Sequence, residues 1–174
     1  MKGYGLLQVY TGDGKGKTTA ALGVILRASG YDAKTIMFQF MKDDPGYGEF
    51  RAQKYLPNFE LIQLGRDSFV DFKNPDPIDV RMMVDGWELA KKAIESEKYD
   101  IIVLDEITIC LATKLLPLTE IIDFLKIHKK NTEIIITGRY APPELLEIAD
   151  LITEMENKKH YFFSGKESRN GIDH

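Results

Sequence analysis

The chain has 174 residues and a mass of 19.8 kDa, which suits one domain rather than two undersized ones. Hydrophobic residues make up 44% and charged residues 29% of it, so the composition excludes an intrinsically disordered chain. The 27 acidic and 23 basic residues give a formal net charge of −4, which excludes a protein-wide positive field that would attract nucleic acid.

The residue types also exclude several kinds of site and compartment. The single cysteine, Cys110, cannot form an intramolecular disulfide or supply a Cys-rich metal site, and it suits a reducing compartment. The three histidines show no short ligand spacing, so we expect no zinc site. No segment approaches the roughly 20 apolar residues of a membrane span. We therefore expect a soluble, cytoplasmic protein with neither a membrane nor a nucleic-acid partner.

Hydrophobic periodicity predicts strands and helices in alternation. Short apolar runs indicate strands, and apolar residues three and four apart indicate amphipathic helices. In chain order they are strand 6–10, Gly-rich loop 12–16, helix 18–29, strand 35–40, short helix 48–55, strand 59–64, loop 65–77, helix 78–97, strand 101–104, helix 117–128, strand 134–137, helix 142–149, and strands 151–155 and 160–163. The alternation predicts one α/β domain over residues 1–174, with a mainly parallel sheet and helices on both faces.

The loop between the first predicted strand and helix has the sequence T-G-D-G-K-G-K-T-T, residues 11–19. Its glycines permit positive φ angles that turn N–H groups toward phosphate oxygens, and the helix that follows presents its positive end. Lys17 supplies a mobile cation and Thr18 a hydroxyl for Mg²⁺. A turn that only caps a helix is the alternative, but the strand, loop and helix context favours a P-loop that binds ATP. Thr11 replaces the usual first glycine.

Two acidic residues, Asp105 and Glu106, end the buried strand 101–104. The carboxyl ends of parallel strands meet at one edge of the sheet, so we expect both near the loop. They are located like the acidic residues that hold Mg²⁺ in P-loop proteins, and solvated turn carboxylates are the alternative. Arg139 follows another strand end, where it either contacts a terminal phosphate or has a structural role. These features predict a P-loop NTPase fold of the RecA-like type.

Several short motifs recur in order along nearly the whole chain. They are T-G-D-G-K-G-K-T-T-A-A at 11–21, Arg27, Q-F-M-K at 39–42, Gly48-Glu49, V-L-D-E-I at 103–107, I-T-G-R at 136–139, A-D-L-I-T-E-M at 149–155, Lys159-His160 and G-I-D at 171–173. In this order and spacing the sequence resembles the P-loop family of corrinoid adenosyltransferases, which act on cob(I)alamin or cob(I)yrinic acid a,c-diamide. The resemblance implies transfer of the 5′-deoxyadenosyl group of ATP to cobalt, with release of triphosphate, in adenosylcobalamin synthesis or salvage.

The implied reaction needs residues that position ATP and stabilise negative charge. Cob(I) is a strong nucleophile, so the reaction requires no side-chain base, only in-line positioning and stabilisation of the polyanionic leaving group. We assign the catalytic roles to Lys17, Lys15 and Arg139, and the Mg²⁺ or Mn²⁺ site to Thr18 with Glu106 first and Asp105 second. The residues assigned to binding ATP or the corrinoid are Gly12, Asp13, Gly14, Lys15, Gly16, Lys17, Thr18, Thr19, Arg27, Phe69 and Phe72.

The resemblance also implies partners and a corrinoid contact. It implies a homodimer with the corrinoid over the ATP-binding edge, and a donor such as a reduced flavoprotein that brings Co(II) to Co(I). In the family, aromatic residues in the loop after the third strand displace the lower axial ligand of cobalt. Phe69 occupies the matching phenylalanine position, but Asp71 replaces the expected tryptophan, with Phe72 beside it. Core packing under the loop is the alternative role for both phenylalanines.

Two other functions stay open from the residues alone. A RecA-like ATP-binding switch or motor module would hydrolyse ATP to ADP in response to a macromolecular partner, although the acidic composition disfavours nucleic acid. A corrinoid delivery protein would bind ATP only to gate release. Triphosphate as the product distinguishes the enzyme from both.

Overall fold

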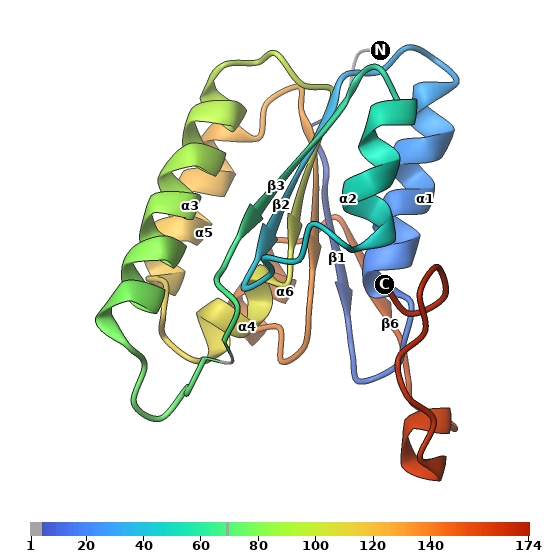
Figure 1. Ribbon diagram of the computed structural model, residues 1–174. Coiled ribbons are helices and arrows are strands. Elements are labelled where there is room, and N and C mark those ends of the chain that lie inside the picture. The colour runs from blue at the N-terminus through green and yellow to red at the C-terminus, as the bar shows by residue number, and fades with distance from the viewer. Residues whose placement is uncertain (1–4, 69) are drawn as a thin grey trace.

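A parallel sheet forms the centre of the computed structural model, which describes residues 5–68 and 70–174 (Figure 1). Its strands are β1 (Leu7–Thr11), β2 (Thr35–Phe40), β3 (Phe59–Leu64), β4 (Ile101–Asp105), β5 (Glu133–Thr137) and β6 (Leu151–Glu154). They are hydrogen-bonded in the order β3-β2-β4-β5-β1-β6, and each of these neighbouring pairs is parallel. The predicted mainly parallel sheet is confirmed.

Helices cover both faces of this sheet, as predicted. The α-helices are α1 (Lys17–Ser29), α2 (Gly48–Ala52), α3 (Pro77–Glu95), α4 (Ile107–Ala112), α5 (Leu118–His128) and α6 (Pro143–Glu147), and the 3-10 helices are η1 (Gln53–Tyr55) and η2 (Tyr161–Ser164). Figure 1 shows α1 and α2 on one face and α3 and α5 on the other. None of the described helices combines the length and the apolar character needed to cross a membrane.

The central strands β1, β2, β4 and β5 bury side chains on both faces, and this divides the core into two layers. Ile102 and Leu104 of β4 belong to the cluster that packs against α3 and α5. Ile101 and Val103, which alternate with them, belong to the cluster that packs against α1. The uninterrupted apolar run of β4 is therefore explained by a strand with both of its faces covered.

One predicted element is wrong, and one helix of the structure was not predicted. The predicted strand 160–163 is wrong, because Tyr161–Ser164 form the 3-10 helix η2 below the sheet (Figure 1). The His160 side chain accepts a 3.1 Å hydrogen bond from the backbone N–H of Phe162, and this local bond favours a turn over a strand. The short helix α4, which directly follows β4, was not predicted from the sequence.

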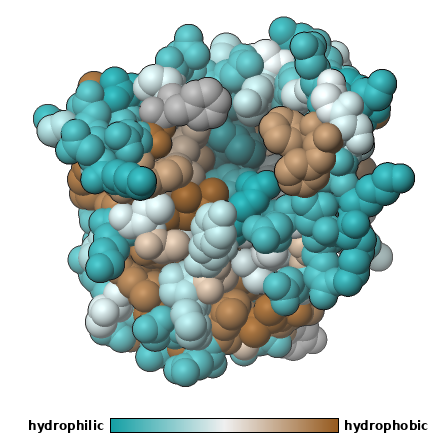
Figure 2. Space-filling view, turned by 90° about the horizontal axis from the view of Figure 1, so that it is seen from below, coloured by the Kyte–Doolittle hydropathy of each residue, from teal (hydrophilic) through white to brown (hydrophobic). Residues whose placement is uncertain are grey.

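The carboxyl ends of the strands all face the same edge, the lower one in Figure 1. The loop after β1, the Asp105-Glu106 pair at the end of β4 and the Gly138-Arg139 pair after β5 all lie at this edge. Seen from this edge, hydrophilic side chains surround a hollow near the middle of the molecule, with apolar patches beside it (Figure 2). The topology thus gathers the three predicted parts of the site.

Candidate active site

The loop that joins β1 to α1 needs glycine for two physical reasons. Gly12 and Gly16 have φ angles of 97° and 118°, in the left-handed region that glycine adopts without strain. Gly14 has no room for a side chain, because a Cβ atom there would lie 2.6 Å from the carbonyl oxygen of Met155. The Gly14 N–H donates to that same oxygen over 2.6 Å. The loop is thus fixed against the chain that leaves β6.

Lys17 lies inside this loop rather than on its surface. Its Nζ donates to the carbonyl oxygens of Gly12 and Gly14 over 2.7 and 2.6 Å. Burial lowers the pKa of the Lys17 ammonium, and the nearby Arg139 lowers it further. Gly16 caps α1 without a side-chain hydrogen bond, so the positive first turn is left to a ligand. A polyanion at the loop would meet both this turn and the Lys17 charge.

Asp105 is fully buried and has donors on both of its oxygens. Its Oδ1 accepts the hydroxyls of Thr18 and Thr137 over 2.8 and 2.6 Å. Its Oδ2 accepts from Lys42 Nζ at 2.7 Å and from Gln39 Nε2 at 3.3 Å. The carboxylate therefore links β2, β4, β5 and the start of α1, and it fixes the direction of the Thr18 hydroxyl.

Glu106 differs from its neighbour, because its Oε2 is buried without a hydrogen-bond partner among the described residues. Its backbone has a φ of 63° and donates its N–H to Thr137 Oγ1 at 3.0 Å. Burial raises the pKa of the Glu106 carboxyl, and the charge of Asp105 raises it further. A buried carboxylate oxygen without a partner suits a divalent cation. The described residues contain no cluster of three or more His, Cys, Asp or Glu that could hold a metal without further ligands.

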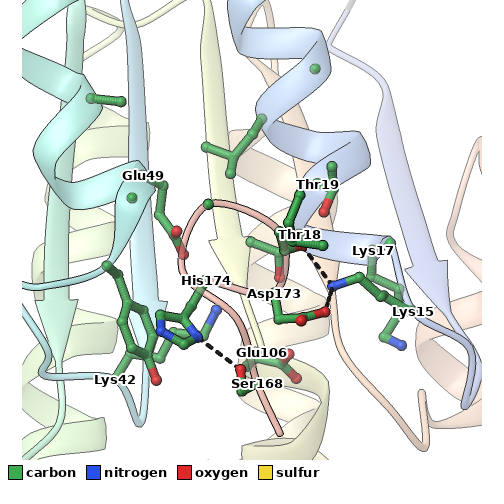
Figure 3. A pocket seen from close by; sticks show the side chains of 18 of the residues that line it. Lys15, Lys17, Thr18, Thr19, Lys42, Glu49, Glu106, Ser168, Asp173 and His174 are labelled. Carbon is green, nitrogen blue, oxygen red and sulfur yellow. Dashed lines mark hydrogen bonds and ion pairs between the residues drawn. The ribbon is translucent and has the colours of Figure 1, made fainter. Parts of the chain in front are cut away.

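These groups line one cavity of about 890 Å³, a size within the range of small-molecule sites. It lies between α1 and α2, and the C-terminal segment crosses it (Figure 3). The residues predicted from the sequence that line it are Gly14, Lys15, Gly16, Lys17, Thr18, Thr19, Glu106 and Arg139. The structure therefore brings the loop, one acidic residue and the arginine together.

The other predicted site residues lie around the cavity or away from it. The carbonyl oxygen of Gly12 accepts a hydrogen bond from Lys17, and Asp13 is exposed and does not line the cavity. Arg27 is exposed in the last turn of α1, ten residues and about 15 Å along the helix from Lys17. Phe72 lies in the loop after β3 with 45% of its surface exposed, and it is not one of the described residues that line the cavity. Phe69 lies outside the described residues.

Sequence reasoning assigned no role to several side chains that the structure brings to the site. Lys42 and Glu49 line the cavity, and Gln39 donates to both Glu49, at 3.0 Å, and Asp105. A glutamine within the apolar run of β2 is the signal that could have identified this group. Asp173 also lines the cavity and pairs with Lys15 over 2.7 Å.

Fold and site together define a class of protein, the α/β proteins with a glycine-rich loop at the carboxyl edge of a parallel sheet. Residues 3–174 match the family described as ATP:corrinoid adenosyltransferase BtuR/CobO/CobP, and the chain belongs to this family. The residues alone left open an adenosyltransferase, an ATP-binding switch or motor, and a corrinoid delivery protein. The family description matches the first of these.

Curated relatives agree with this family. A corrinoid adenosyltransferase of Sinorhizobium sp is 37% identical over 172 residues, which cover 97% of this chain and 80% of the relative. The corrinoid adenosyltransferase of Escherichia coli strain K12 is 33% identical over 171 residues, covering 98% and 86%. Corrinoid adenosyltransferase CobA of Salmonella typhimurium strain LT2 is 33% identical over 170 residues with the same coverage. The resemblance predicted from the motifs is confirmed, and the chain is an ATP-dependent corrinoid adenosyltransferase of cobalamin synthesis or salvage.

Proposed function

We propose that the cavity beside α1 is where the 5′-deoxyadenosyl group of ATP passes to the cobalt of a reduced corrinoid, and that the loop of residues 11–19 holds the triphosphate. The observation that carries this proposal is the meeting of three features in one cavity. They are the lysine-filled glycine loop, the first turn of α1 without a side-chain cap, and the unpartnered oxygen of Glu106. Each of these features suits a polyphosphate or its cation.

The reaction requires positioning and positive charge rather than a base. The electron pair of Co(I) attacks C5′ of ATP, so a Co–C bond forms while the bond from C5′ to the triphosphate oxygen breaks. Cobalt becomes formally Co(III), and the triphosphate leaves with the electrons of the broken bond. No proton is taken from the nucleophile, and the cations that line the cavity, Lys15, Lys17 and Arg139, stabilise the leaving group.

Thr18 and Glu106 are the proposed ligands of Mg²⁺ or Mn²⁺. Asp105 supports this choice, because it directs the Thr18 hydroxyl while its own oxygens are occupied by protein donors. A bound cation would neutralise part of the polyphosphate charge. Thus Glu106 is the direct acidic ligand in this proposal, and Asp105 orients Thr18.

The fold assignment can be made finer in the same proposal. We assign the chain to the P-loop NTPases of the RecA-like type, as one domain over residues 1–174. Two observations support this assignment: the glycine loop connects β1 to α1, and β5 lies between β1 and the acidic strand β4.

The remaining parts of the proposal rest on the family resemblance. We propose a cytoplasmic homodimer that receives its electron from a donor such as a reduced flavoprotein. Phe69 and Phe72 are the proposed residues that displace the lower axial ligand of cobalt, and the exposure of Phe72 on its loop supports a contact with a substrate.

The test is to incubate the protein with ATP, Mg²⁺ and chemically reduced cob(I)alamin. We expect the light-sensitive spectrum of an alkylcobalamin, with triphosphate as the second product. The K17M variant should lose at least about 100-fold in rate, because it removes the buried charge from the loop. The K126M variant, which changes an exposed lysine of α5, should keep the wild-type rate. Folded protein that yields ADP, or no Co–C spectrum, contradicts the proposal.

A further inference from the structure

The segment of residues 168–174, here called the strap, crosses the mouth of the cavity. From η2 the chain returns to the lower end of α1 (Figure 1), and in Figure 3 the strap passes in front of the cavity, between α1 and α2. Five of its residues line the cavity, namely Ser168, Gly171, Ile172, Asp173 and His174. The strap is therefore a wall of the nucleotide site.

One lysine of the loop joins the strap to the phosphate site. Lys15 Nζ donates to the carbonyl oxygen of Ile172 over 2.9 Å and pairs with Asp173 Oδ1 over 2.7 Å. The Tyr161 hydroxyl also interacts with this ammonium, so Lys15 is held by three groups of the C-terminal region. Although partial burial lowers the pKa of Lys15, its hydrogen bond to Asp173, the Asp173 charge and the interaction with Tyr161 together outweigh burial and raise that pKa, so the ammonium stays charged.

Asp173 is itself held firmly. The Tyr161 hydroxyl donates to its Oδ1, and the backbone N–H and Nε of Arg169 donate to its Oδ2 over 3.0 and 3.1 Å. The Arg169 guanidinium lies 4.7 Å from the centre of the Tyr161 ring. The Asp173 side chain is only 10% exposed. It is thus a fixed acceptor rather than a mobile surface carboxylate.

The last residue of the strap, His174, contacts both the strap itself and the residue before α2. His174 contacts Ser168 Oγ and Asn170 Oδ1 through its two ring nitrogens, each over 2.8 Å. The His174 ring lies 5.0 Å from the ring of Tyr47, which precedes α2. The strap therefore contacts the α2 side of the cavity through Tyr47 and the α1 side through Lys15.

We propose that Asp173 is a positioning residue for ATP: it holds the charged ammonium of Lys15 at the mouth of the cavity, where this charge meets the triphosphate. This rests on the proposed function, in which the loop binds that triphosphate. A lysine that is already fixed loses less side-chain entropy when the phosphate binds. The negative charge of Asp173 acts in the opposite direction, because it repels a polyanion. Whether removal of this charge weakens or strengthens triphosphate binding therefore tests the proposal.

The experiment is a double-mutant cycle on the binding of inorganic triphosphate with Mg²⁺, measured by calorimetry. We expect D173N to weaken binding by about 3- to 10-fold and K15M by about 10-fold. The double variant D173N/K15M should bind as weakly as K15M alone, since Asp173 acts through Lys15. The D173E variant, which keeps the charge, should recover part of the loss.

The E167Q variant is the matched control for this measurement. E167Q changes an exposed carboxyl directly before the strap and should bind like the wild type. Tighter or unchanged binding by D173N overturns the assignment, as do independent losses that add in the double variant. A wild-type protein that binds neither triphosphate nor ATP overturns the proposed function itself.

Discussion

Glu106 has a buried carboxylate oxygen without a hydrogen-bond partner among the described residues, and this has a measurable consequence. Its carboxyl pKa is raised by burial and by Asp105, so the ionised form is less favourable in the folded chain than in the unfolded chain. Below the ordinary carboxyl pKa the group is protonated in both states and contributes nothing. Above the raised pKa the folded chain carries the full cost. We therefore expect E106Q to unfold at higher urea than the wild type at pH 7 without metal.

The same substitution should have the opposite effect on the reaction. Without the Glu106 charge, the proposed metal site loses its acidic ligand, and we expect the rate to fall by about 100-fold. Near pH 4 the stability difference should vanish, because wild-type Glu106 is then protonated. E167Q serves as the control for both measurements. An E106Q protein that is less stable than the wild type at pH 7 contradicts the assigned cost.

The sequence predicted those site residues that lie in local motifs or at strand ends. Lys17 and Thr18 lie within one short loop, and Glu106 follows a clear buried strand, so local pattern was enough to predict them. Gln39 was missed because its role comes from the register of β2 beside β4, where it is directly paired with Asp105. Asp173 was missed because its partner, Lys15, lies 158 residues earlier, and no periodicity connects the two.

At the scale of elements, α1 contains a glycine that weakens the helix. Gly23 lies in the middle of the 13 residues of α1, where glycine is less favourable than alanine. A Cβ atom at this position would have no neighbour within 4 Å among the described residues. We therefore expect G23A to raise the free energy of unfolding by about 0.5–1 kcal/mol, measured in urea. A G23A protein of equal or lower stability contradicts this.

Elements were predicted best where burial alone determines them. β2 and β3 have the bounds that their apolar residues predicted. β2 is buried along its whole length, whereas β3, at the edge of the sheet, buries Phe59, Leu61 and Leu64 and exposes Glu60. The helix α4 was missed because it starts directly after Glu106, whose positive φ gives no sequence signal in a residue other than glycine. The apolar run at η2 resembled a strand, yet Phe162 and Phe163 are 69% and 77% exposed. Hydrophobic residues alone therefore do not make a strand without a neighbour to pair with.

At the scale of the whole molecule, the chain is acidic, but several of its cationic side chains gather at the cavity. The formal net charge is −4, yet the cations Lys15, Lys17, Lys42, Arg139 and Lys166 all line the cavity. The acidic residues Glu49, Glu106 and Asp173 line it too, so cations outnumber carboxylates by five to three. A concave site with an excess of positive charge attracts a polyanion even when the whole protein has a net negative charge. In the proposed function, this local excess of positive charge attracts the triphosphate of ATP.

The cavity is built from both ends of the chain, from Gly14 to His174, so a ligand in it should stabilise the whole fold. At a free Mg²⁺-ATP concentration of 100 times Kd, we expect about 2.7 kcal/mol of added stability. Trp87, the one tryptophan, is buried under α5 on the face opposite α1. If residues 1–174 are one domain, the urea midpoint from Trp87 fluorescence must shift as far as the midpoint from circular dichroism. A Trp87 midpoint that stays unchanged while the dichroism midpoint shifts would mean that the two faces of the sheet unfold independently.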